Sequence, residues 1–221
     1  MKKCILAVVV ITMILAGHTV VARESAPIIG VTAKVGTLGP GVDLTLNLGS
    51  YFNLRGGYNG FTYERSMDMD EAEIDGELIL ETIPILLDWH PFEGGFRISG
   101  GVVLNNNELS FSATPGDEFE LEEVHYIVTS LDGEATFNRT SLYIGIGSGN
   151  AVDKDGKIHF NCDFGLMFHG APELEATGTA INPAFQSMLN DSLQAEVDQW
   201  EDDAKVFSFW PVLSIGVSIC F

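Results

Sequence analysis

Alternation of apolar with small side chains in the last twelve residues, 210–221, is the feature that most constrains the fold of this chain. Five apolar residues are separated there by Ser, Gly or Cys: Leu213, Ile215, Val217, Ile219 and Phe221. A repeat of two residues places one kind of side chain on each face of a β-strand. An apolar face opposite a small, polar face is typical of a strand that separates lipid from a polar lumen. The alternative is an ordinary edge strand of a soluble sheet.

Residues 1–22 match a secretory signal peptide. Lys2 and Lys3 precede an apolar run too short to span a bilayer, and Val20-Val21-Ala22 offers small residues for cleavage. Later apolar runs are all shorter than the roughly 18 residues of a membrane helix. We therefore expect a secreted chain, residues 23–221, without a transmembrane helix.

Acidic residues far outnumber basic ones. The chain has 31 Asp and Glu against 11 Lys and Arg, and a formal net charge of −20. Because affinity for nucleic acid comes from neutralising phosphates, this charge excludes nucleic acid as a partner. Two cysteines, Cys162 and Cys220, follow the signal peptide. Alternation places them on opposite faces of a sheet, so we expect no disulfide between them.

Segments that alternate with period two recur along the chain, separated by turns and polar stretches. The expected strands are 29–37, 42–48, 54–63, 77–90, 96–105, 128–137, 141–147, 160–168, 173–180 and 210–221. We expect acidic loops at 64–77 and 105–123, and a hairpin turn at 138–140. All ten segments would make a barrel of ten strands, which we prefer. Unbroken apolar alternation over 160–174 and 38–48 would instead merge segments and give eight.

One segment, 182–205, is the good helix candidate. Asn182 can cap it, and Pro183 lies in its first turn. Its apolar residues recur at helical spacing: Phe185, Met188, Leu189, Leu193, Val197 and Trp200. We expect this helix to lie in a loop, most simply over the mouth of the barrel.

Three hairpin sequences carry a family resemblance. Residues 39–48 (GPGVDLTLNL), 53–61 (NLRGGYNGF) and 86–101 (LLDWHPF followed by FRISGG) resemble hairpins of small OmpA-like and OmpW-like outer-membrane barrels. Phe221 is similar to the terminal aromatic residue that the barrel-assembly machinery reads in that class. The resemblance implies an all-β, closed antiparallel transmembrane β-barrel of eight to ten strands, in contact with outer-membrane lipid and lipopolysaccharide. A soluble lipocalin-like barrel is the alternative, and it would need the apolar faces inside.

Alternation also selects charged residues that would face the lumen. These are Asp43, Arg55, Arg97, Asp132, Glu134 and Asp163, together with Lys34 and Asn161. Charges in a narrow lumen must pair, because burying an unpaired charge is costly. Side chains fill barrels of eight strands, and ten strands add little room. We therefore predict a lumen plugged by charge pairs and a structural or surface-interaction role. A narrow pore for ions or small polar solutes is the alternative.

Residues for catalysis or metal binding are hard to assemble from this sequence. A lipid-directed enzyme, the third hypothesis, would need a nucleophile with a positioned histidine, and we find no His-x-Ser pair of the kind that lipid A deacylases carry. His159 and His169 are ten residues apart, or roughly 33 Å along one strand. The acidic segments lack the spacing of a calcium-binding EF loop. We therefore predict no catalytic residues, no metal and no cofactor.

Overall fold

The structure is a computed structural model that describes residues 27–69, 72–115, 118–121 and 124–221. The expected signal peptide, 1–22, lies outside the described residues. Within the described ranges, no helix is long and apolar enough to cross a membrane.

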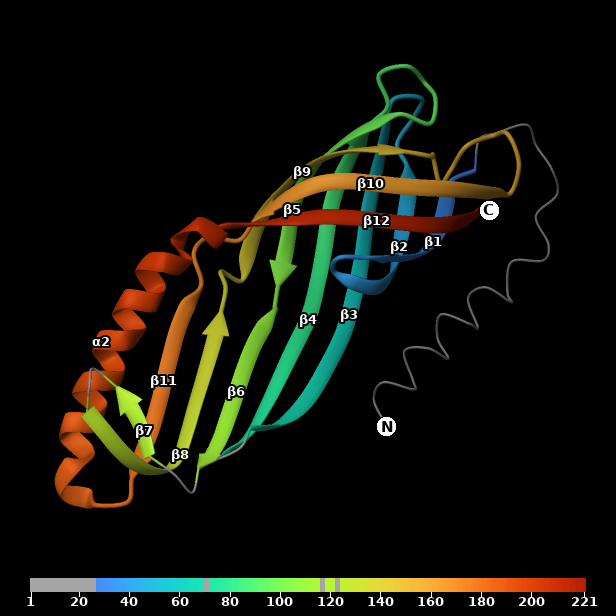
Figure 1. The fold of residues 1–221 in the computed structure, drawn as a ribbon. Coiled ribbons are helices and arrows are strands. Elements are labelled where there is room, and N and C mark those ends of the chain that lie inside the picture. The colour runs from blue at the N-terminus through green and yellow to red at the C-terminus, as the bar shows by residue number, and fades with distance from the viewer. Residues whose placement is uncertain (1–26, 70–71, 116–117, 122–123) are drawn as a thin grey trace.

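Eight antiparallel strands form a closed barrel (Figure 1). They are β1 (Ile29–Gly36), β2 (Gly39–Asn47), β3 (Phe52–Met69), β4 (Ala72–Trp89), β5 (Arg97–Asn105), β9 (Thr140–Ser148), β10 (Ile158–Phe168) and β12 (Phe209–Cys220). Each strand pairs with the next in this order, and β12 returns to pair with β1, which closes the ring. The expected closed, all-β antiparallel barrel is confirmed. It has eight strands, so the preference for ten was wrong.

A second, open sheet continues from one side of the barrel, and we call it the extension (Figure 1). It contains the outer halves of β3 and β4, with β6 (Glu108–Pro115), β8 (Val124–Thr136), β11 (Glu173–Ala180) and the short β7 (Glu118–Leu121). β4 pairs with β5 over 82–89 and with β6 over 72–79, without a change of register. β5 and β6 are therefore successive parts of one long strand, and so are β8 and β9.

The extension corrects several expectations. The acidic segments 64–77 and 105–123, expected to be loops, run through β3, β4, β6 and β7. Residues 128–137 and 141–147 do not form a hairpin. Instead, β8 pairs with β6 and β11, whereas β9 pairs with β5 and β10. The alternation that suggested two further barrel strands is real, but β8 and β11 lie in the extension.

The extension also inverts the distribution of polar and apolar side chains. In the barrel part of β3, Leu54 points outward and is 37% exposed, while Arg55 points inward and is 6% exposed. Farther along the same strand, the outward position is Glu64 and the inward position is Tyr63. β4, β6 and β8 show the same switch. Apolar side chains therefore cover the outside of the barrel and the inside of the extension.

A register shift makes this switch between β10 and β11. Phe168 of β10 lies opposite Leu142 of β9, and Glu173 of β11 lies opposite Thr136 of β8. Between these two pairs the chain from β10 to β11 advances 5 residues, whereas the chain from β8 to β9 spans 6. Even-numbered side chains consequently move from the outer face to the inner face, where Leu174 lies. The apolar alternation in the sequence is unbroken across 160–174, although the face that it describes changes.

The expected helix, 182–205, is confirmed and lies along β11 (Figure 1). It begins with a 3-10 turn at Pro183–Phe185, continues as α2 (Gln186–Ala204) and ends with a 3-10 turn at Lys205–Phe207. Asn182 caps it as expected, because its Oδ1 accepts a hydrogen bond of 3.1 Å from the Ala184 N–H. The helix covers the side of the inner face that is formed by β11 and the neighbouring β8.

Two kinds of contact hold α2 on the extension. Buried leucines of the helix pack against Val128 and Ala180 of the sheet, with Leu131 and Ala176 beside them. Gln186 also donates to the Gly178 carbonyl at 2.8 Å, and Glu201 accepts from the Leu174 N–H at 3.0 Å. The helix side chains therefore satisfy backbone groups along β11, which would otherwise be an open sheet edge.

The cysteines lie as alternation predicted. Cys162 is exposed on the outer face of β10, and Cys220 is buried at the end of β12. The Cys220 Sγ lies 3.3 Å from the Gly156 carbonyl oxygen. Both residues are free thiols in the structure.

We expect Leu189→Ala to loosen the extension without opening the barrel. Leu189 of α2 is fully buried between the helix and the sheet, so its truncation removes about 2–5 kcal/mol of packing free energy. Met188 is 51% exposed, and Met188→Ala, the matched control, should change stability by less than about 0.5 kcal/mol. Hydrogen exchange of 173–204 should accelerate in the first variant alone, while heat-dependent gel migration keeps reporting a closed barrel. Equal exchange in both variants would contradict the packing described.

Candidate functional site

Six charged side chains meet inside the barrel, and we call them the charge layer: Lys34, Asp43, Arg55, Asp88, Arg97 and Asp163. They come from six strands, β1 to β5 and β10. Three are cations and three are carboxylates, so their formal charges balance. Their side chains are at most 11% exposed. The charge layer is therefore a buried, neutral network that spans the barrel.

Arg55 lies at the centre of the charge layer. Its Nε lies 3.0 Å from an Asp88 oxygen, and its Nη1 lies 3.1 Å from Asp163 and 3.6 Å from Asp43. Arg97 Nη2 contacts the other oxygen of Asp163 at 2.7 Å. Charge-assisted bonds of this kind are short and strong, and several of them offset the desolvation of a buried guanidinium. One arginine thus holds carboxylates from three strands.

The remaining contacts of the charge layer leave almost no free space. Lys34 Nζ lies 2.7 Å from an Asp43 oxygen, and the Ser99 hydroxyl donates to Asp88 at 2.5 Å. The cavity that these residues enclose measures about 10 Å³. A single water molecule needs roughly this volume.

Glycines in the barrel wall make room for these side chains. A Cβ at Gly57 would overlap Oδ1 of Asp43, and one at Gly147 would lie 2.9 Å from the Arg97 guanidinium carbon. At Gly56, by contrast, a Cβ would meet nothing within 4 Å. Gly57 and Gly147 therefore leave the space in which the Asp43 and Arg97 side chains cross the lumen.

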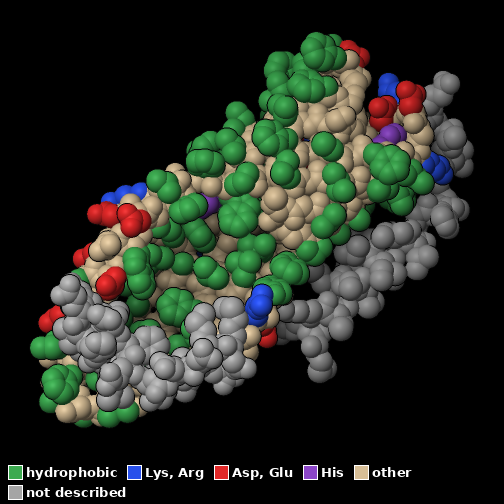
Figure 2. All heavy atoms as spheres, viewed as in Figure 1, with side chains coloured by type: hydrophobic (Ala, Val, Ile, Leu, Met, Phe, Trp, Pro, Cys, Tyr) green, Lys and Arg blue, Asp and Glu red, His purple; other side chains and the backbone are tan. Residues whose placement is uncertain are grey.

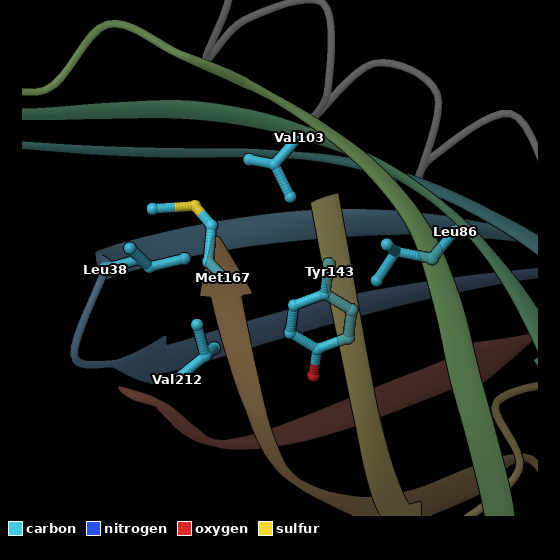
Figure 3. Packing of buried hydrophobic residues seen from close by; sticks show 6 residues of the cluster. All are labelled: Leu38, Leu86, Val103, Tyr143, Met167 and Val212. Atoms are coloured by element: carbon cyan, nitrogen blue, oxygen red, sulfur yellow. The ribbon is translucent and has the colours of Figure 1, made fainter. Parts of the chain in front are cut away.

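A layer of apolar side chains lies across the lumen beside the charge layer (Figure 3). It consists of Leu38, Leu86, Val103, Tyr143, Met167 and Val212, with Trp210 packed against it. A Cβ at Gly145 or Gly165 would lie 2.5 Å from the Tyr143 hydroxyl oxygen, so these two glycines let the tyrosine lie flat along the wall. Met167 is completely buried. We call this set the apolar layer.

Amides and one histidine fill the lumen near the short turns. Asn53 Nδ2 donates to Asn150 at 3.0 Å and contacts His90 Nε2 at 3.1 Å. His90 Nδ1 lies 2.9 Å from the Gly94 carbonyl oxygen, so Nδ1 carries the proton and Nε2 accepts. This polar layer lies on one side of the charge layer and the apolar layer on the other. Beyond the apolar layer the interior is polar again, where Asn59 donates to the buried Thr82 hydroxyl at 2.9 Å.

The structure brings together five of the eight predicted lumen residues. Lys34, Asp43, Arg55, Arg97 and Asp163 lie in the charge layer, as expected. Asn161 is also buried in the lumen, where its Nδ2 donates to the Ser218 hydroxyl at 2.8 Å. Asp132 and Glu134 do not, because they lie on the outer face of β8 in the extension. Their placement was wrong because we took polar alternate positions to face inward, and this relation reverses above the barrel.

Sequence reasoning missed Asp88 and the apolar layer. Asp88 stands between Leu87 and Trp89, which are both exposed on the outer face, so alternation could have found it. Tyr143 and Met167 also occupy inward positions of their strands. An apolar residue at an inward position carries no sequence signal of its own, because the pattern distinguishes only the two faces.

Polar side chains form two rows across the outer face of the extension. One row is Glu64, Glu77, Ser110, Glu134 and Glu175, and the other is Ser66, Asp75, Ser112, Asp132 and Thr177. They line a hollow of about 560 Å³. Among the described residues, no group of three or more His, Cys, Asp or Glu is placed to hold a metal ion. The rows thus form a diffuse negative surface.

Comparisons with known proteins were made at the level of sequence and of fold. No protein-family model and no curated protein sequence matches this chain. Two solved structures from Acinetobacter baumannii are similar to it, CarO2 (TM-score 0.58) and CarO (TM-score 0.57). Each is 19% identical, and the matches cover 89% and 90% of this chain and 100% of the CarO2 and CarO chains. The chain shares their fold. Membership of the OmpA-like or OmpW-like class stays a prediction.

Arg55→Met should destabilise the barrel strongly. The substitution leaves three buried carboxylates with two cations, and removal of one partner from a buried ion pair costs about 3–5 kcal/mol. Arg139 is exposed, so Arg139→Met is a control expected to change stability by less than about 0.5 kcal/mol. The temperature at which the folded gel band converts to the unfolded band should fall for Arg55→Met alone. An unchanged conversion temperature would show that the network does not hold the barrel together.

Adjacent glycines give a second test. Gly57→Ala should cost about 1–3 kcal/mol, because the new methyl group overlaps the Asp43 carboxylate. Gly56→Ala should be close to neutral, since its methyl group would meet no neighbouring atom. Urea unfolding followed by tryptophan fluorescence measures both. The same loss for both substitutions would mean that strand flexibility, and not the crowded lumen, requires glycine here.

Proposed function

We propose that this protein is an integral outer-membrane β-barrel with a lumen closed by side chains and a structural or surface-interaction role. The observation that carries the proposal is the distribution of side chains around the barrel: apolar outside, polar and charged inside. A soluble barrel of the lipocalin kind needs the opposite arrangement.

The outer surface of the barrel supports a lipid environment. Large apolar residues that are 37–65% exposed lie on its strands: Val35, Val42, Leu44, Leu54, Ile85, Leu87, Leu104, Leu142, Ile144, Ile146, Phe164, Leu213, Ile215, Val217 and Ile219. Soluble monomers rarely expose contiguous apolar surface of this extent. Trp89, Phe92 and Phe96 are exposed around one short turn, as an interfacial aromatic girdle requires. Outer-membrane lipid and lipopolysaccharide are the partners that this surface fits.

The extension supports one orientation in the membrane. Outer-membrane barrels keep short turns on the periplasmic side and longer segments outside. The extension is the longer end, and the rows of carboxylates on its outer face are incompatible with a hydrocarbon environment. We therefore place the extension at the cell surface. This placement is the basis for a surface-interaction role.

Two layers of side chains support a closed lumen. The charge layer encloses only about 10 Å³. The side chains of the apolar layer offer an ion only the Tyr143 hydroxyl and the indole N–H of Trp210, which packs against the layer. An ion that gives up its hydration shell needs such groups along its path. This arrangement favours the plugged barrel over the narrow pore.

The end of β12 supports a role in assembly. Phe221 is 50% exposed, and its N–H donates to the Ile29 carbonyl at 2.9 Å where β1 and β12 close the ring. Its side chain is therefore free for recognition while its backbone is fixed. The barrel-assembly machinery is the partner that we assign to it.

Planar-bilayer conductance tests the closed lumen. Wild-type protein should give no steady ion steps. Two double variants each remove one layer: Arg55→Ala with Asp163→Ala removes the charge layer, and Tyr143→Ala with Met167→Ala removes the apolar layer. Neither double variant should conduct, because the other layer still closes the lumen. The variant with all four substitutions should conduct. Heat-dependent gel migration must show that each variant is folded. Steady steps from the wild-type protein would overturn the plug and favour a narrow pore.

A further inference from the structure

The inner face of the extension is an apolar surface that α2 covers only in part, and we call it the inner trough. Its uncovered floor consists of Phe61, Tyr63, Leu109 and Phe111, which are 37–49% exposed. Figure 2 views the molecule from this side and shows hydrophobic side chains gathered over the extension strands. Unlike the outer surface of the barrel, this face lies beyond the lipid-facing band. Its exposure therefore calls for another occupant.

The floor of the inner trough is continuous across three strands. Tyr63 of β3 lies opposite Leu78 of β4, which lies opposite Leu109 of β6. The Phe61 and Tyr63 rings are stacked with their centroids 6.5 Å apart. Leu and Phe side chains form no hydrogen bonds, so an occupant must present an apolar face to them.

The helix α2 forms one bank of the inner trough. Trp200 is three residues after Val197 and seven after Leu193, on the stripe that is buried against the sheet, yet it is 44% exposed. Phe185 and Met188 are each 51% exposed. The apolar surface thus continues from the floor onto the helix.

The charges on this bank are negative. α2 contains six acidic residues and no basic residue: Asp191, Glu196, Asp198, Glu201, Asp202 and Asp203. Gln186 and Glu201 face the edge of β11, so helical spacing places Glu196 and Asp203 on the other flank of the buried stripe, toward the trough. Lys205, just beyond the helix, is paired with Asp202, whose carboxylate raises the pKa of Lys205. Arg65 is the cation that alternation places on the inner face of β3, away from this bank.

We propose that the inner trough binds a cationic amphipathic helix from another peptide or protein, with its apolar face on the floor and its basic residues beside Glu196 and Asp203. This proposal rests on the proposed position of the extension at the cell surface. A helix in an apolar groove is a recurring mode of peptide recognition. Charge complementarity selects a basic partner, because the bank is acidic and the chain carries a formal net charge of −20. An anionic lipid would meet repulsion from the same bank.

The dimensions of the bank suggest a suitable probe. α2 has 19 residues and is therefore about 28 Å long at 1.5 Å per residue. An 18-residue amphipathic helix of Leu and Lys would lie beside it along its full length. Two comparison peptides isolate the two requirements: a scrambled Leu/Lys sequence without an apolar face, and a Leu/Glu sequence with the same apolar face.

Binding is measured by fluorescence anisotropy with the full chain in nanodiscs of zwitterionic lipid, after subtraction of binding to empty nanodiscs. The Leu/Lys helix should bind at least tenfold more tightly than either comparison peptide. Glu196→Lys with Asp203→Lys should weaken it at least tenfold. Asp191→Lys with Asp198→Lys changes the net charge equally on the outward side of α2 and should weaken it less than threefold. Leu109→Asn should weaken binding without changing heat-dependent gel migration.

Each other outcome overturns the proposal. Equal loss in both charge-reversal variants would mean attraction by net charge alone. Tighter binding of the Leu/Glu helix would point to an anionic amphiphile as the occupant. If none of the three peptides binds, the inner trough is not a binding site for an amphipathic helix. The proposed orientation is tested separately, by whether protease added to intact cells cleaves the extension, and the closed lumen is tested by bilayer conductance. Failure of the peptide to bind is therefore distinguishable from failure of the proposed barrel function.

Discussion

Arg55 imposes the constraint on which the interior of this barrel depends. A guanidinium that is 6% exposed must be surrounded by anions and hydrogen-bond acceptors, because its burial alone would cost several kcal/mol. Asp88 and Asp163 supply carboxylates from strands on either side of the ring, and Arg97 shares the second of these. Neighbouring positions must then be small, as Gly57 and Gly147 are. The buried charge of Arg55 thus explains both why carboxylates and glycines line the lumen and why their side chains fill it.

The strands that continue from the barrel into the extension exchange apolar for polar residues on their outer face in two ways. β3 and β4 continue through it with an unchanged register, yet their outward residues change from Leu54 to Glu64 and from Leu87 to Glu77. β10 and β11 reach the same result by a register shift with little change in the apolar pattern. A change of residue type in β3 and β4 and a register shift between β10 and β11 both replace apolar by polar residues on the outer face at the junction of barrel and extension. This agreement indicates that the surroundings of the outer face change there. The inversion also leaves the inner face of the extension apolar, which α2 partly covers.

Much of the fold could be predicted from alternation alone, because each barrel strand has an exposed apolar face that period two reveals. Five of the six charge-layer residues followed from the same alternation, and the capped helix followed from helical spacing and Asn182. The strand count did not, because β8 and β11 alternate as barrel strands do although they pair outside the ring. Asp132 and Glu134 were misplaced since alternation defines two faces without saying which one is inside. Partners across the barrel, such as Arg55 and Asp163, are 108 residues apart and are set by ring closure, which no local pattern contains.

The energetics of the extension argue that it is more than a continuation of the barrel. Glu64 lies directly opposite Glu77, and Glu134 directly opposite Glu175, and like charges in these positions destabilise a sheet by about 0.2–1 kcal/mol per pair. Neutral or oppositely charged pairs at these positions would make the sheet more stable. The apolar inner face is a separate feature, because α2 covers only part of it. Both features oppose solubility or stability of the extension by itself. Neither is needed to close the barrel, whose strands pair fully below this level. The binding role that we propose for the inner trough accounts for its incomplete cover. The pairs of like charges lie on the other, outer face, which the proposed orientation exposes to water.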